Sequence, residues 1–228
     1  MAKKKVAAKH KTSKEGTGEG NRKEVVAEQT GPDPAKPAGI TYQTLDKDPT
    51  HRADFTFTWS AGDCFNATCT QKHVTISDPA DWESQNIVRV SVSDIGLSGM
   101  RFHKKVARQF VALFKAVSGT VIKPLTNSGT CVARTITNNE KKLSNHALGT
   151  AIDINAAENP YNGTQAKRGA AGSVAEIADK CADFGIYWGG WYSSKKDPMH
   201  FEAVKVLDEE ALKAACTTHG VDYESTKV

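Results

Sequence analysis

Two short segments in the second half of the chain concentrate the side chains that can do chemistry. Residues 144–153 read SNHALGTAID, and residues 197–202 read DPMHFE. A catalytic zinc site takes three protein ligands, imidazole nitrogens or carboxylate oxygens, and leaves one position open for water. His146, Asp153 and His200 supply such a set. We therefore predict that they bind a divalent metal ion, for which Zn2+ suits the ligand types best.

The alternation of residues around two of these ligands predicts where their side chains point. On an extended strand Ile152 and Ile154 face the core, so Asp153 between them faces the other way. For the same reason His200 and Glu202 share one face of a second strand. We expect both strands to present their polar faces to one open site.

Four further residues beside these segments are candidates for contact with a substrate or for local structure. Ser144 either donates a hydrogen bond to substrate or caps a turn. Gly149 permits a close backbone approach or an unusual dihedral angle between the first two ligands. Trp188 and Trp191 have flat rings that either line a cleft for a peptide or belong to the core.

The two segments resemble a family of zinc-dependent peptidoglycan peptidases. It includes D-alanyl-D-alanine carboxypeptidases, the VanX and VanY dipeptidases and phage L-alanyl-D-glutamate endolysins, with the pattern SxHxxGxAxD followed by (Asp/Glu)xxH. Both halves of this pattern are complete here. The similarity covers about residues 98–205, and FGIYWGGWYSSKKDPMHFE is similar to the endolysin-like branch in its order WGG-W-D-HF. Residues 40–97 match no such pattern.

The resemblance implies a role for each residue of the pattern. His146, Asp153 and His200 are implied zinc ligands, and Asp197 stands at the position of the general base. Many relatives have Glu at that position, so the reach of the shorter Asp is an open point. Glu202 competes for the role of base, or else it holds the His200 imidazole in one tautomer.

The resemblance also implies an arginine upstream of the first ligand that stabilises the tetrahedral intermediate. Arg134, in the alternating segment CVARTI, is the first candidate. Arg101 and Arg108 are alternatives on a predicted helix, and a surface salt bridge is the alternative role for Arg134.

The elements around these motifs predict an α+β domain with a small antiparallel sheet and flanking helices, and the resemblance implies a Hedgehog/DD-peptidase-like fold. Alternating or apolar runs predict strands over residues 54–59, 73–77, 86–92, 120–125, 131–136, 148–155 and 200–204. Apolar residues at helical spacing predict helices over residues 98–117, 173–184 and 207–216. The absence of a GxGxxG turn argues against a dinucleotide-binding fold.

Composition divides the 228-residue chain, of formal net charge +4, into three parts. Residues 1–39 hold nine Lys and Arg against five Asp and Glu and have no Leu, Ile, Phe, Tyr or Trp, which predicts a disordered basic tail. Residues 40–97 are expected to be a β-rich segment of unknown role, and residues 98–220 the zinc peptidase domain. Because all the excess charge lies in the tail, a nucleic-acid-binding protein is a weak alternative and no nucleic-acid partner is expected.

Cysteine usage and hydropathy limit where the protein acts. Cys64 and Cys69 would close a small disulfide in an oxidising compartment, and Cys181 falls on an apolar helical stripe. No run of about 18 apolar residues is present, so no membrane span is expected. The start of the chain has no apolar stretch typical of a signal peptide. We expect synthesis in the cytoplasm and action in the periplasm or cell wall after lysis or delivery.

The metal-binding motif and its resemblance to the zinc-dependent peptidases together imply zinc-dependent hydrolysis of a peptide bond in bacterial peptidoglycan stem peptides. An endopeptidase, cutting the L-Ala-D-Glu bond or a cross-link, is the first expectation, in a phage lysin or an injected effector that docks on a phage tail or injection machine through its N-terminal region. A D,D-carboxypeptidase is one alternative. A catalytically inactive binding module that keeps zinc as structure is another.

Overall fold

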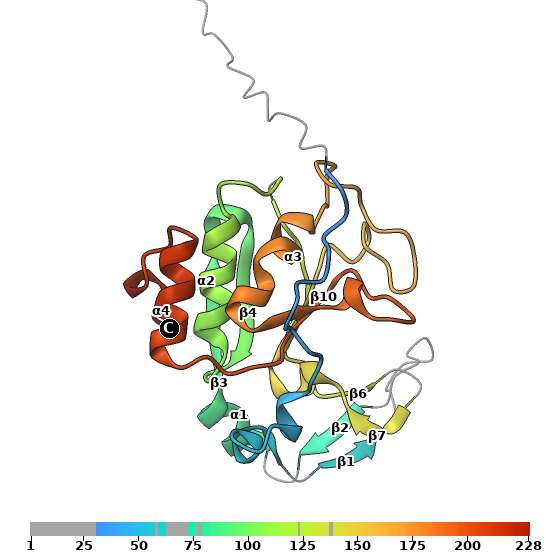
Figure 1. The fold of residues 1–228 in the computed structure, drawn as a ribbon. Helices are drawn as coiled ribbons and strands as arrows, with labels where there is room; N and C mark the ends of the chain where they lie inside the picture. The colour runs from blue at the N-terminus through green and yellow to red at the C-terminus, as the bar shows by residue number, and fades with distance from the viewer. Residues whose placement is uncertain (1–30, 58, 63–72, 77–78, 123, 137–138) are drawn as a thin grey trace, which may run out of the picture.

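A four-stranded antiparallel sheet lies at the centre of the fold (Figure 1). The computed structural model describes residues 31–57, 59–62, 73–76, 79–122, 124–136 and 139–228. In order across the sheet, the strands are β5 (Asn127–Gly129), β8 (Ala151–Ile154), β10 (His200–Ala203) and β9 (Ile186–Trp188). The predicted α+β class, with a small antiparallel sheet and flanking helices, is confirmed.

Three helices pack together beside this sheet (Figure 1). They are α2 (Ala107–Val117), α3 (Ala175–Cys181) and α4 (Glu209–Thr218). Phe110 and Phe114 of α2 are fully buried in the same hydrophobic cluster as Ile152 and Phe201 of the sheet. Burial of large apolar side chains on both sides therefore holds the two central strands in place.

The register of β8 and β10 explains how the two motifs meet. Asp153 pairs directly with His200 across the sheet, and Ile152 pairs with Phe201. Ile152 and Ile154 are fully buried while Asp153 is only half-buried, as the alternation predicted. A shift of one residue would turn Asp153 into the core, so burial of the isoleucines also fixes the acid in the site.

The predicted helix over residues 98–117 is wrong in its first half. Residues Leu97–His103 form β4, which pairs with β3 (Ile87–Val92), and the helix begins only at Ala107. Met100 and Phe102 are buried while Arg101 between them is half-buried, which is the period of a strand. Phe102 falls at helical spacing from the residues of α2, which explains the error. This hairpin also joins both sides of the expected boundary at position 98.

Three predicted strands are shorter than expected or absent. Residues Arg52–Phe55 form a 3-10 helix, and β1 begins only at Trp59. The backbone after α2 continues as turns and then runs irregularly, so no strand covers the described part of residues 120–125. Of residues 131–136, only Thr135–Ile136 form a strand, β6. Local turn hydrogen bonds replace a partner strand at residues 52–55 and directly after α2. In the third case the Val132 nitrogen donates to the His146 carbonyl and the Arg134 carbonyl accepts from the Ser144 nitrogen.

The remaining elements form two small hairpins and a short helix (Figure 1). Strand β1 (Trp59–Gly62) pairs with β2 (His73–Ile76), and β6 pairs with β7 (Asn139–Leu143). Helix α1 spans Pro79–Asn86. The predicted strands at 73–77 and 86–92 are thus confirmed within a residue or so, as are the last strand and last helix.

The chain from residue 31 onward lies along the sheet as an extended segment, which we call the strap (residues 31–44; Figure 1). The carbonyl of Pro34 accepts a hydrogen bond from the Trp191 indole at 3.1 Å, and that of Pro32 accepts one from Arg168 at 3.2 Å. Part of the predicted disordered tail is therefore ordered. Residues 1–30 lie outside the described residues.

Within the described part of the chain, no helix is long and apolar enough to cross a membrane. Cys181 is fully buried, as predicted. Cys131 and Cys216 are also free and buried. Cys64 and Cys69 lie outside the described residues, so their pairing stays a prediction.

Gly149 is expected to be essential for stability because its place admits no side chain. Its φ is +66°, and a Cβ there would lie 2.6 Å from Ile87 Cδ1 and 2.8 Å from the His103 nitrogen. We expect Gly149→Ala to lower the free energy of unfolding by about 2–4 kcal/mol. Gly119→Ala, where a Cβ meets no atom within 4 Å, is the control in urea denaturation. Equal effects of the two substitutions would contradict this account.

Candidate metal centre

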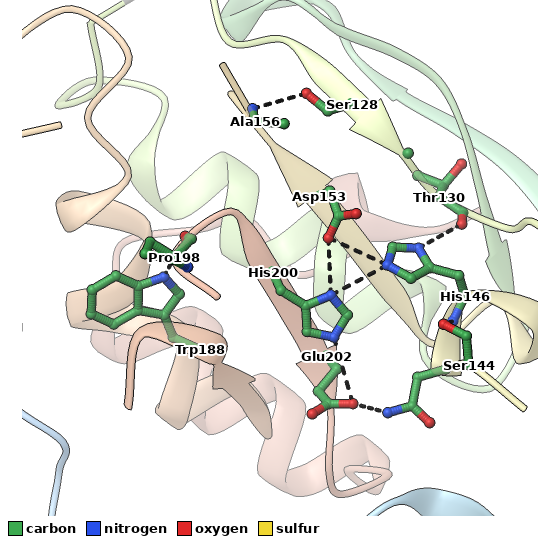
Figure 2. Close-up of polar contacts among 12 residues, drawn as sticks. Ser128, Thr130, Ser144, His146, Asp153, Ala156, Trp188, Pro198, His200 and Glu202 are labelled. Carbon is green, nitrogen blue, oxygen red and sulfur yellow. Dashed lines mark hydrogen bonds and ion pairs between the residues drawn. The ribbon is translucent and has the colours of Figure 1, made fainter. Parts of the chain in front are cut away.

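Two imidazoles and one carboxylate converge between the 3-10 helix η4 (Asn145–Leu148) and strands β8 and β10 (Figure 2). Asp153 Oδ1 lies 2.9 Å from His200 Nδ1 and 3.3 Å from His146 Nε2, and the two nitrogens are 3.2 Å apart. These three predicted ligands offer one atom each to a common point. They are the group of His, Cys, Asp and Glu side chains in the described residues that could hold a metal ion.

A single turn of 3-10 helix, η4 (Asn145–Leu148), positions His146. Ser144 caps this turn, since its Oγ accepts a hydrogen bond from the His146 backbone nitrogen at 3.3 Å. The His146 Nδ1 lies 2.8 Å from the Thr130 carbonyl oxygen (Figure 2). Because a carbonyl only accepts, Nδ1 carries a hydrogen, which leaves Nε2 as the nitrogen that would bind a metal. Ser144 thus has the turn-capping role, while it also lines the cavity of the site.

Glu202 faces the His200 nitrogen that points away from Asp153, as the Thr130 carbonyl does for His146 (Figure 2). Its Oε2 lies 3.7 Å from His200 Nε2, which leaves Nδ1 facing Asp153. Glu202 is fully buried and accepts hydrogen bonds from the Tyr192 hydroxyl, at 2.6 Å, and from the Asn145 amide. With its lone pairs engaged in this way, Glu202 fits the holding of an imidazole better than the role of general base.

The electrostatics of the three converging groups favour a cation. Burial disfavours the charged form of His146 and lowers its pKa. At His200 burial acts in the same direction, but Asp153 and Glu202 outweigh it and raise the pKa to about 10. Burial alone would raise the pKa of Asp153, yet hydrogen bonds from both imidazoles hold it far below its usual range. A buried carboxylate that stays ionised is balanced by positive charge at this point.

Asp197 reaches the same cavity from the loop before β10. Its backbone nitrogen donates to the Gly189 carbonyl, and its carbonyl accepts from the His200 nitrogen, both at 3.0 Å. A Cβ on Gly189 would lie 2.4 Å from the Asp197 carbonyl oxygen, so glycine at 189 allows this close approach. Burial, more than its charged neighbours, raises the pKa of Asp197 to about 6. Its Oδ1 is buried and has no hydrogen-bond partner among the described residues.

One of the three candidate arginines lies at the site. Arg134 lines the cavity, and the charges of Asp153 and Asp197 partly offset the burial that lowers its pKa. Arg101 pairs instead with Glu83, and Arg108 donates to the Tyr223 hydroxyl at 2.8 Å. Only Arg134 of these three candidates therefore lines the cavity.

The cavity around these groups has a volume of about 550 Å³. Its lining includes the three converging side chains, Asp197, Arg134 and Glu202, with Tyr42, Tyr161 and Lys195 among the others. Polar groups of both signs face a space large enough for several residues of a peptide.

The two predicted tryptophans lie away from this cavity. Trp188 is 2% exposed, belongs to the hydrophobic core, and donates its indole N–H to the Pro198 carbonyl at 2.7 Å (Figure 2). Trp191 packs against the core and donates to the strap. Neither lines the cavity, so the core alternative describes Trp188, and Trp191 anchors the strap.

Several residues of the site did not emerge from the sequence. Tyr192 and Asn145 are adjacent to predicted residues, and their polar side chains beside a motif were the available signal. The Thr130 carbonyl carries no signal because every residue has one. Tyr42 is distant in sequence from both motifs and reaches the cavity only because the strap folds back.

Neutralising Glu202 is expected to weaken metal binding without unfolding the protein. Glu202→Gln keeps the shape but removes the charge that faces His200 Nε2 and one of the two acceptor oxygens. We expect the affinity for Zn2+ to fall about 10–100-fold. Competition with a chromogenic chelator measures it, with Glu210→Gln, at an exposed position of α4, as the control. Unchanged affinity would show that Glu202 does not hold the imidazole.

Comparison with protein families gives a match over the part of the chain that holds the site. A protein-family model described as D-alanyl-D-alanine carboxypeptidase matches residues 137–203. Those residues contain η4, β8, β9 and β10, and thus all three converging ligands together with Asp197. No curated protein and no solved structure gave a match.

Proposed function

We propose that the protein is a zinc-dependent peptidase of bacterial peptidoglycan stem peptides. The premise is the match of residues 137–203 to the D-alanyl-D-alanine carboxypeptidase family. One observation carries this proposal. The ligand atoms of His146, Asp153 and His200 lie within 3.3 Å of one another. Beside them lies the carboxylate of Asp197, whose Oδ1 has no hydrogen-bond partner among the described residues. Such a ligand set with a nearby free base is the arrangement that metal-assisted hydrolysis needs.

The donor geometry fits a zinc ion. Four ligands at about 2.05 Å in a tetrahedron lie about 3.3 Å from one another. The three separations here run from 2.9 to 3.3 Å. The Thr130 carbonyl and Glu202 face the far nitrogen of each imidazole, so a metal ion would take the place of a proton at the near nitrogen. A bound zinc ion would supply Lewis-acid chemistry, polarising the peptide carbonyl and the attacking water.

The residues of this chain would then handle the proton and the developing charge. Asp197 accepts the proton of the attacking water at its carboxylate and delivers it to the leaving amine. Arg134 donates hydrogen bonds to the oxygen that becomes negative in the transition state. Thr130 and Glu202 keep the two imidazoles in the tautomers that bind metal.

Mass-resolved digestion of purified peptidoglycan tests this function and names the bond. Release of cross-link or stem fragments that stops with EDTA would support an endopeptidase. Loss of terminal D-Ala alone would support the D,D-carboxypeptidase that the description of the matched family favours. No change in any product with added zinc would contradict a peptidase of this substrate and favour the inactive binding module.

The pH dependence of kcat/KM is expected to show an acid limb governed by Asp197. Its carboxylate is the active form, so activity is full above its pKa, about 6, and falls tenfold per pH unit below it. A bound cation lowers this pKa, which places the limb at or below pH about 6. Because Arg134 also lowers it, Arg134→Gln should move the limb to higher pH. An unchanged limb in Asp197→Asn would assign the titration elsewhere.

Delivery to the cell wall belongs to the same proposal. Residues 1–39 hold all the excess positive charge, and residues 31–39 of them form the first part of the strap. We propose that this N-terminal region docks the enzyme on a phage tail or injection machine. In the other route the whole enzyme reaches the wall after lysis of the cell.

A further inference from the structure

A second cavity, of about 340 Å³, adjoins the metal cavity and has no part in the chemistry described above. The two cavities share Tyr42, Ile136 and Asn145 as lining residues. Tyr42 is 48% exposed and Ile136 is 43% exposed, although both are large and apolar. A peptide that reaches from one cavity into the other would cover these side chains.

The walls of this second cavity come from two distant parts of the chain. One wall comprises Thr44, Asp46 and Lys47 with Phe55–Phe57, which lie outside the segment matched by the family model. The other is Lys141–Leu143 of β7. The cavity thus exists only because the N-terminal region folds against the peptidase segment.

The charge of this cavity is positive. Its lining includes three exposed lysines, Lys47, Lys141 and Lys142, against Asp46 as the one acidic residue in the lining. Its apolar part comprises Phe55, Phe57, Ile136, Leu143 and Leu148. The hydroxyl of Thr44, also in the lining, is buried and has no hydrogen-bond partner among the described residues. Cationic side chains around an apolar surface suit an anionic peptide with small apolar residues.

We propose that this cavity, the basic subsite, binds a carboxylate-bearing part of the stem peptide next to the scissile bond. Successive residues of a strand face opposite sides, so one of the two β7 lysines, Lys141 or Lys142, pairs with the carboxylate. Tyr42 contacts the backbone that leads to the metal site. Tyr42 of the strap is held there by edge-to-face contacts of its ring with Tyr187 and Tyr192, at ring-centroid distances of 5.4 and 5.3 Å. This inference rests on the proposed function, because it assigns part of that substrate to a place.

Steady-state kinetics with three synthetic stem peptides tests the basic subsite. The first peptide has all its carboxylates free, the second has the D-Glu carboxylate amidated, and the third has the C-terminal carboxylate amidated. For Lys141→Glu with Lys142→Glu, we expect KM for the free peptide to rise about tenfold while kcat changes less than twofold. The amidated peptide for which these substitutions no longer raise KM identifies the carboxylate that the subsite binds.

The control has the same change of charge at a distance from both cavities. Lys167→Glu with Lys227→Glu alters two exposed lysines that line neither cavity and should leave KM unchanged. An equal rise in KM for all three peptides, or for the control protein, would overturn the basic subsite and leave only a general effect of charge. Unchanged KM in Lys141→Glu with Lys142→Glu would overturn it as well.

Calorimetric binding of the same peptides to Zn2+-loaded protein separates this inference from the proposed function. In one outcome no peptide is cleaved, but the parent protein binds the free peptide about tenfold more tightly than an amidated one, and Lys141→Glu with Lys142→Glu abolishes this difference. The basic subsite then stands and the peptidase function fails. If peptides are cleaved without such discrimination, the peptidase function stands and the basic subsite is overturned.

Discussion

His146→Ala is expected to abolish hydrolysis of stem peptides, with kcat/KM reduced at least about 10³-fold. The substitution removes one of three converging ligands, and its Nε2 lies 3.3 Å from Asp153 and 3.2 Å from His200. The two remaining groups would hold a metal ion weakly. Bound zinc, measured by atomic emission after dialysis, should fall from one equivalent to almost none.

His219→Ala is the matched control for this loss. His219 pairs with Asp183 at 2.8 Å, directly after α4, and does not line the metal cavity. Activity and zinc content of this variant should match the parent protein. Full activity of His146→Ala without bound metal would refute the metal-dependent mechanism, whereas loss of activity with unchanged zinc would remove His146 from the ligand set.

Asp197→Asn is expected to lower kcat about 10²–10⁴-fold while zinc stays bound. The amide keeps the size of the side chain but cannot accept the proton of the attacking water. Asp197 is not one of the three converging ligands, and its Oδ1 has no hydrogen-bond partner among the described residues. The substitution therefore removes a base without breaking a described contact of that oxygen.

A split between activity and zinc content distinguishes this role from a structural one. Asp94→Asn, at an exposed position of the 3-10 helix Ser93–Ile95, should change neither quantity. Parallel loss of zinc and activity in Asp197→Asn would show that Asp197 supports the metal site. Retained turnover would refute its role as base, and Glu202 would then be the carboxylate to test.

The converging ligands could be found from the sequence because the patterns that carry them are local. The eight residues from His146 to Asp153 span parts of one 3-10 turn and one strand, and the period of that strand alone points Asp153 away from the core. The positive φ of Gly149 was foreseeable in the same way. The strand from His200 to Ala203 is equally short and equally alternating.

The helix predicted over residues 98–117 shows where local patterns fail. Phe102 satisfies the period of a strand and, with the residues of α2, the period of a helix. Pairing of β4 with β3 decides between the two, and this pairing involves backbone groups that no side-chain pattern reports. Tertiary context therefore overrode the helical spacing.

The motif residues, their ligand chemistry and the α+β class were determined by the sequence itself. Only the tertiary structure decided that Arg134 rather than Arg101 or Arg108 lines the cavity, that Trp188 is core, and that Glu202 accepts from Tyr192. It also decided that Tyr42 of the strap lies at the metal site. The physical reason is that ligand type and side-chain period depend on neighbouring residues, whereas a contact between distant segments depends on the packing of the whole core.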